Sequence, residues 1–188
     1  MDNIIEKGSR NGLFTREIEL NNRYATIIRY LKEEVNIFSS FRDAYLNAAI
    51  IGFLKNANTS NFKLNENVKP ASIFPNELSA RRADLRFVFR IIMAVKDEDD
   101  YKIDDYMNRT FRDGSEEDSY SGLDEKMEIF NTYVCKGLDY LYNKFENIHN
   151  QEEIVNTLYE ILRDIGIESG LVVPDGLPDF DVNDIIVE

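Results

Sequence analysis

The side chains that carry out most enzyme chemistry are rare in this sequence. Its 188 residues contain one histidine, His149, and one cysteine, Cys135. Nucleophilic triads and imidazole metal sites need histidine, and His149 falls in a polar stretch between two predicted helices, where we interpret it as a surface residue. Cys135 lies inside an apolar pattern with no histidine beside it, so we expect a small buried side chain rather than a nucleophile. These two residues alone cannot complete a zinc site.

Carboxylates are concentrated in one short segment. Six acidic residues fall between Asp97 and Asp105, and acids gather divalent metal in nucleases and phosphatases. These acids are nearly consecutive, however, and lack the spacing and glycine of an EF-hand loop, so we favour a solvated acidic loop. A metal-dependent nuclease built on residues 97–105 stays as an alternative. The glycine-rich motifs that bind nucleotide phosphates are also absent. The favoured interpretation therefore assigns no catalytic residue, metal or cofactor.

One basic feature stands out against the acidic background. Arg82, Arg86 and Arg90 recur every four residues and form one stripe on a predicted helix. Guanidinium groups in this arrangement bind carboxylates or phosphates. Three interpretations follow: an ion network with the chain's own residues 97–105, an acidic segment of a partner protein, or nucleic-acid phosphates. The formal net charge of −13 opposes nucleic acid and favours the other two, with the network inside the chain as the simpler interpretation. Arg82, Arg86 and Arg90 are kept as candidate partner-binding residues.

Apolar residues at helical spacing predict the elements that position these groups. Five helices are expected, over residues 15–34, 40–55, 75–95, 123–145 and 151–165, the last ended by Gly166. The predicted fold is all-α, a compact bundle in one domain over residues 1–166, with an acidic flexible middle loop at 97–122 and an extended acidic tail at 167–188. Arg16, Arg23 and Arg29 scatter around the first helix, and we expect them to be solvated.

The helix at 40–55 carries the clearest local signals. Ser40 followed three residues later by Asp43 predicts a capping box. Ala44, Ala48 and Gly52 then recur every four residues, which leaves one helix face nearly bare and indicates a close neighbouring helix. That neighbour belongs either to the same chain, for example at the second small residue Gly137, or to a partner.

The C-terminal tail is a second candidate for docking. Apolar residues including Phe180 and Ile185 alternate irregularly with aspartates, and no basic residue occurs in the stretch. This composition is typical of a peptide that folds on a basic, grooved partner. The tail would equally serve to cover the chain's own core.

Charge and composition restrict where the chain works. The negative charge opposes attraction to anionic lipid as well as to nucleic acid. The longest apolar run, residues 48–54, is far shorter than the roughly 20 residues that span a bilayer. The first residues do not resemble a signal peptide, and a lone cysteine fits a reducing compartment. We therefore expect a cytoplasmic protein.

The small-residue segments also suggest a family. The sequence FSSFRDAYLNAAIIGF at 38–53 resembles the Phe-x-x-aromatic-Arg-Asp and Ala-Ala-x-x-Gly segment of small proteins encoded beside bacterial DNA phosphorothioation genes, the Dnd-system-associated proteins. The sequence YVCKGL at 133–138 resembles their Tyr-Ala-x-Gly-Gly element, with valine for alanine and lysine for one glycine. The resemblance covers about a quarter of the chain. It implies an anti-phage defence or DNA-modification operon and implies no catalytic residue.

These observations lead to one main functional hypothesis. The chain is expected to be a non-enzymatic accessory subunit of a bacterial defence or DNA-modification complex, acting by helix packing and acidic surface on a partner ATPase or nuclease. The partner would come from the same operon, and a homo-oligomer is also compatible with the small-residue ridge. A subunit that contacts DNA through the Arg82, Arg86 and Arg90 stripe, or mimics DNA with its acidic surface, is the alternative from a different class.

Overall fold

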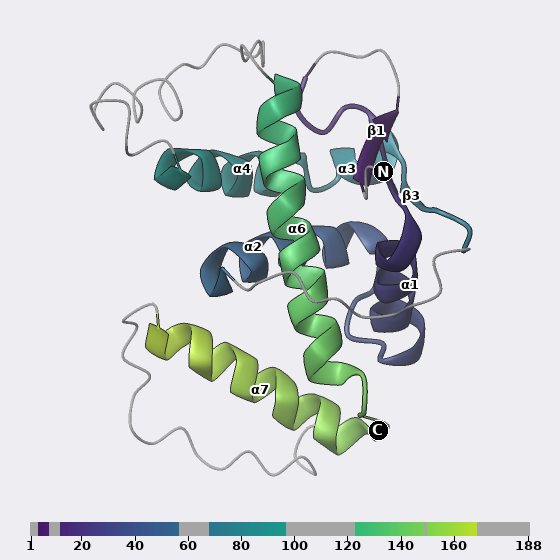
Figure 1. Cartoon of the computed structure of the whole chain (residues 1–188), viewed down its shortest axis with the longest axis vertical. Coiled ribbons are helices and arrows are strands. Elements are labelled where there is room, and N and C mark those ends of the chain that lie inside the picture. The colour runs from purple at the N-terminus through teal and green to yellow at the C-terminus, as the bar shows by residue number, and fades with distance from the viewer. Residues whose placement is uncertain (1–3, 8–11, 57–67, 97–122, 149, 169–188) are drawn as a thin grey trace. The chain divides into compact units, whose positions relative to one another are not determined.

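The computed structural model describes residues 4–7, 12–56, 68–96, 123–148 and 150–168. This part of the chain is mostly helical, as the sequence predicts, with one small sheet. In chain order the elements are β1 (Ile4–Lys7), β2 (Glu17–Leu20), α1 (Asn22–Arg29), the π-helical turn η1 (Tyr30–Glu34), α2 (Phe41–Lys55), β3 (Ala71–Ile73), α3 (Pro75–Ser79), α4 (Arg82–Lys96), α6 (Leu123–Phe145) and α7 (Gln151–Glu168). They are shown in Figure 1.

The sheet corrects the prediction of an all-α fold. Its strand order is β1-β2-β3, and both pairs are antiparallel. Ile18 on the central strand lies opposite Glu6 on one side and Ile73 on the other. Ile18 and Leu20 are fully buried while their neighbours are half-exposed, so one face of the sheet covers the core. Strands of three or four residues are too short for their alternation to be distinguished from a helical pattern.

Two predicted helices are divided in the structure. The helix expected from residue 15 begins only at Asn22, because the preceding residues 17–20 form β2, and its last turn is the π-helical η1. The helix expected over 75–95 is two helices, α3 and α4. At their junction the Ala80 and Arg81 amides bond to carbonyls three residues back, and the regular ladder resumes with the bond from Leu85 to the Arg81 carbonyl.

The helix α2 begins and ends as its sequence predicts. The Ser40 hydroxyl accepts a hydrogen bond from the Asp43 amide at 3.2 Å, which confirms the N-cap. Asn56 ends the helix in the left-handed conformation, with φ of 40°, a role that asparagine tolerates. The long helix α6 covers residues 123–145 as expected.

Aromatic side chains fill the centre of the first unit. The Phe130 ring of α6 lies 5.4 Å from Phe14, 5.8 Å from Tyr45 of α2 and 5.9 Å from Phe89 of α4. All four residues are at most 1% exposed. Phe14 has φ of 57°, a left-handed conformation that strains a bulky residue, and its burial among these rings offsets that cost. The cluster joins α2, α4 and α6.

The chain divides into two compact units, Met1–Asn143 and Lys144–Glu188. The described helix of the second unit, α7, is capped by Asn150, whose side chain accepts a hydrogen bond from the Glu153 amide at 2.8 Å. It buries Ile154 and Ile161. Gly166 lies inside this helix, so the prediction that it ends there is wrong. The predicted domain boundary at residue 166 stays a prediction, because the tail lies outside the described residues.

Helices that cross a membrane are both long and apolar. Among the helices that the structure describes, none combines the length and the apolar character that a bilayer span requires.

Candidate functional site

Polar side chains of α1 and α6 form a buried hydrogen-bonded cluster. Asp139 is completely buried, and its Oδ2 atom accepts hydrogen bonds from Arg23 Nη2 at 2.5 Å and from the Tyr24 hydroxyl at 3.3 Å. Arg23 also donates to the Tyr24 oxygen at 2.7 Å. The expectation that Arg23 is solvated is therefore wrong, since its side chain is 14% exposed and compensates a buried carboxylate.

Cys135 belongs to the same cluster. The prediction that it is buried is confirmed. Burial raises the pKa of its thiol to about 12, more than the hydrogen bond with Tyr24 lowers it. Burial also raises the pKa of Tyr24. At neutral pH both groups are protonated, so neither is an activated nucleophile or base.

A second polar group lies beside the sheet. The Tyr45 hydroxyl donates a hydrogen bond to Asn131 Oδ1 at 2.6 Å. Burial raises the pKa of Glu6, an effect that Arg16 opposes from 3.9 Å. Arg16 also lies 3.3 Å from Asp124 of α6, so this arginine too is engaged rather than solvated. The Arg16 contacts thus link β1 to the start of α6, and the Tyr45 bond links α2 to α6.

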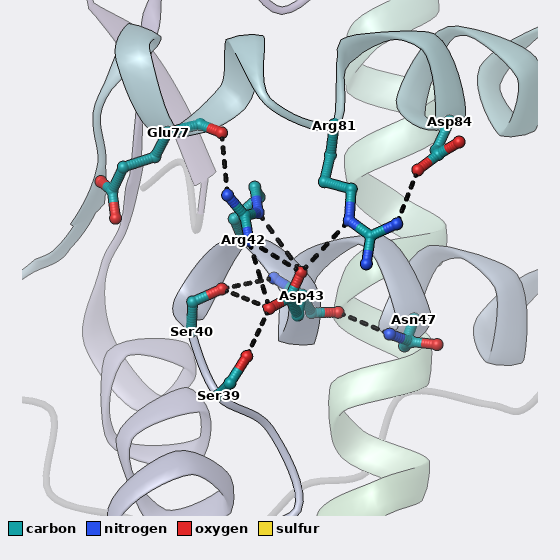
Figure 2. A network of polar contacts seen from close by, with 8 residues as sticks. All are labelled: Ser39, Ser40, Arg42, Asp43, Asn47, Glu77, Arg81 and Asp84. Atoms are coloured by element: carbon teal, nitrogen blue, oxygen red, sulfur yellow. Dashed lines mark hydrogen bonds and ion pairs between the residues drawn. The ribbon is translucent and has the colours of Figure 1, made fainter.

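The start of α2 is bonded to α3 and α4 through Asp43 (Figure 2). The Asp43 Oδ2 atom accepts hydrogen bonds from the hydroxyls of Ser39 and Ser40, both at 2.7 Å. Arg42 donates to Asp43 and to the Glu77 carbonyl of α3, while Arg81 lies 3.8 Å from the same carboxylate. Burial raises the pKa of Asp43, but the hydrogen bonds from the two serines and from Arg42 outweigh it and lower the pKa overall.

The small-residue ridge of α2 is filled by α6. Ala44 and Ala48 are fully buried, and Gly52 is buried as well. A Cβ atom built on Gly52 would overlap the Tyr133 carbonyl group and lie 2.7 Å from the Gly137 nitrogen. A Cβ atom on Gly137 would overlap the Ala48 carbonyl and lie 2.9 Å from its Cα.

We call this contact between α2 and α6 the glycine crossing. Two helix backbones touch there because neither has a side chain in the way. Of the two alternatives for the ridge, the structure has the one within the chain. Ala44, Ala48 and Gly52 are thus removed from the set of partner-binding residues.

The exposed surface of α4 has a different composition. The arginine row, Arg82, Arg86 and Arg90, is half-buried along the helix. Beside it runs an apolar row made of Phe87, Ile91 and Val95, which repeats at the same four-residue spacing. Phe87 is 56% exposed and Val95 is 51% exposed. We call the two rows together the α4 outer face.

Comparison of the chain with family models, with curated proteins and with solved structures gives no match.

Other predicted sites lie outside the described residues. These are the acidic run at 97–105, His149, and the tail residues Phe180 and Ile185. Within the described ranges, no group of three or more histidine, cysteine or acidic side chains is placed to hold a metal ion. The arginine row is therefore the predicted site that the structure both describes and leaves partly at the surface.

Two features of the structure were missed by sequence reasoning. Asp139 is a single acid among the buried apolar positions of α6, and that position was the signal for a buried ion pair. The apolar row of α4 was missed because its helix already has an inward face made of Leu85, Phe89 and Ile92. Apolar residues on both sides of one helix are the signal for an additional contact surface.

Proposed function

We propose that this chain is a non-enzymatic interaction subunit that binds a partner protein through the α4 outer face. The observation that carries the proposal is the exposure of Phe87 and Val95 directly beside the arginine row. Aromatic residues and arginine are the residues enriched in the buried centres of protein interfaces. A monomer gains nothing from leaving such side chains in water.

The state of the other polar groups supports a role in binding rather than in catalysis. Asp139 and Arg23 neutralise each other, and the thiol of Cys135 has its pKa raised by burial. Asp43 holds the start of α2 through hydrogen bonds that lower its pKa. Each of these groups is already used by a contact that holds helices together, whereas active-site groups are poised for a substrate.

The setting of the proposed complex comes from the resemblance to Dnd-system-associated proteins. Its two segments, 38–53 and 133–138, contain the residues of the glycine crossing and are in direct contact. The resemblance thus covers one packing unit rather than two unrelated stretches. On this basis we propose a cytoplasmic subunit of an anti-phage defence or DNA-modification complex, in which a partner ATPase or nuclease supplies the chemistry.

The direct test is to purify the protein from the cells that encode it, with a small tag and at its natural level. We expect it in a complex well above its own 21.9 kDa, with a stoichiometric partner encoded by a neighbouring gene. The isolated chain should neither hydrolyse ATP nor cut DNA in the presence of Mg²⁺ or Mn²⁺. A monomer without a partner, or metal-dependent cleavage by the isolated chain, would contradict the proposal.

A further inference from the structure

The α4 outer face defines the chemistry of its partner. Resting on the proposed function, we infer that the bound segment is an acidic amphipathic helix, which lies along α4 with carboxylates on the arginine row and apolar residues on the apolar row.

The two rows have matching lengths and spacing. Each contains three residues four positions apart, and at 1.5 Å per residue each row is about 12 Å long. At 100° per residue, Arg86 and Phe87 place the rows about 100° apart around the helix. A partner helix presents side chains at the same repeat, so charged and apolar contacts are made together along about two turns of each row.

The two rows are neighbouring ridges of α4. Ala83 lies four residues before Phe87 and Ala94 lies four residues after Arg90, so these two small residues continue the rows at opposite ends. The surface between the two ridges is a groove bordered by the side chains of both rows. Ridges of a second helix pack into grooves of this kind. An extended peptide turns a single row of alternate side chains toward α4 and so meets one of the two rows, whereas a helix presents two adjacent rows on one face.

The charge of the partner follows from the arginine row. The Nε atoms of Arg82 and Arg90 are buried and have no hydrogen-bond acceptor in the described part of the chain. A buried donor without an acceptor costs free energy. These atoms are already enclosed, so a partner carboxylate meets Arg82 and Arg90 only at the part of each side chain that stays at the surface, where a guanidinium pairs with a carboxylate through charge-assisted hydrogen bonds.

Nucleic acid fits this surface less well. Phosphates would satisfy the arginine row, but the apolar row beside it would gain nothing from a phosphate backbone. The net charge of −13 would also repel a duplex. An acidic helix of a protein uses both rows, whereas a duplex uses one.

Selection from a library of displayed peptides tests this inference without knowing the natural partner. Random peptides of about 16 residues, roughly four helical turns, are selected on the full-length protein. We expect the recovered peptides to be rich in aspartate and glutamate with apolar residues at helical spacing. Recovered peptides that are neutral or basic, or a selection that recovers no specific binder, would overturn the inference.

Paired variants show whether such peptides use α4. The substitutions Phe87→Ala and Arg90→Glu should each weaken binding about tenfold or more, an effect typical of interface hot spots. Matched controls are Phe74→Ala, at an equally exposed phenylalanine, and Arg163→Glu, at an exposed arginine of α7. These controls should stay within about twofold of the wild type. Equal losses in variants and controls would place the binding elsewhere and contradict the inference.

Two other ligands could occupy the α4 outer face, namely the chain's own acidic run at 97–105 and DNA, and each is tested separately. Replacing the acids of residues 97–105 by their amides should leave peptide affinity unchanged; a tenfold rise in affinity would assign the α4 outer face to the chain's own acidic run and overturn the inference.

A DNA duplex of about 20 base pairs should not bind the protein at about 50 mM salt. Tight binding that Arg90→Glu abolishes would overturn the inference in favour of DNA. If the natural complex depends on α4 but the peptides are not acidic, the proposed function stands and this inference fails.

Discussion

Small residues occur on α2 and on α4, but the two helices use them in opposite ways. On α2, Ala48 and Gly52 are covered by the backbone of α6, which leaves no room for one additional carbon atom. On α4, Ala83 and Ala94 each lie one four-residue step beyond a row of large side chains, and Ala83 is exposed. A small residue therefore does not by itself show that another helix lies close. Burial separates the contact within the chain on α2 from the exposed face of α4, for which we propose a partner.

The two helices are also joined to each other. The Asp43 network ties the start of α2 to the junction of α3 and α4 through Arg42 and Arg81 (Figure 2). The aromatic cluster around Phe130 joins both helices to α6. The α4 outer face thus belongs to a helix that is held by polar contacts at its start and by aromatic packing on its inner side, and such a support would reduce the entropy lost on binding the proposed partner.

The largest effect is expected at the glycine crossing. Gly137→Val places side-chain atoms where the Ala48 backbone now lies, and a backbone cannot move aside cheaply. We expect the free energy of unfolding to fall by at least about 3 kcal/mol in urea titrations. The control Ala83→Val introduces valine at an exposed position of α4, where the free energy of unfolding should fall by less than about 1 kcal/mol. Equal losses of unfolding free energy at the two sites would contradict the proposed difference between α2 and α4.

The next effect concerns the buried cluster between α1 and α6. Arg23→Met leaves the Asp139 carboxylate buried without its cation, and we expect a loss of about 2 to 3 kcal/mol. Arg163→Met, which breaks an exposed ion pair with Asp164, should change stability by less than about 0.5 kcal/mol. Thermal or urea unfolding measures both. A stable Arg23→Met protein would show that the cluster does not hold these helices together.

A smaller effect is expected from acid at the link between α2 and α4. The folded-state pKa of Asp43 is lowered, so its contribution to stability is present above the unfolded pKa of about 3.9 and is lost as the pH falls through the folded value. Asp43→Ala should lose about 1 kcal/mol at pH 7 and little at pH 2. Stability curves of both proteins from pH 2 to pH 7 measure this convergence. Parallel curves would mean that the carboxylate contributes nothing.

The smallest effect on folding is expected on the α4 outer face. Phe87→Ala and Arg82→Ala remove exposed or half-exposed atoms, so each should change the free energy of unfolding by no more than about 0.5 kcal/mol. Urea titration under the conditions used for Gly137→Val gives the comparison. A loss of 2 kcal/mol or more would assign these side chains to the core of the fold instead of to a partner.

The sequence predicted best where a pattern was long or had a distinct cap. The apolar repeat of α6 extends over 23 residues, and Ser40 with Asp43 defines the start of α2, so both elements are confirmed. The sheet was missed because its strands have three or four residues. The Arg23 to Asp139 pair joins positions 116 residues apart, a distance over which local spacing carries no information.

The candidate site was predictable only in part. The arginine row is visible as a four-residue repeat, but the exposure of Phe87 depends on which side of α4 faces the aromatic cluster. Both sides of this helix are apolar, so the sequence offers two candidate inner faces. The packing of Phe89 against Phe130 selects one of them and leaves Phe87 outside.

The central claim is that the protein works by contact through α4, and one comparison tests it most directly. Wild type, Phe87→Ala and Phe74→Ala are produced at natural levels in the original cells, and the partner recovered with each is measured by quantitative mass spectrometry. The account predicts that Phe87→Ala recovers about a tenth of the wild-type amount or less, while Phe74→Ala recovers all of it. Full recovery with Phe87→Ala would contradict it.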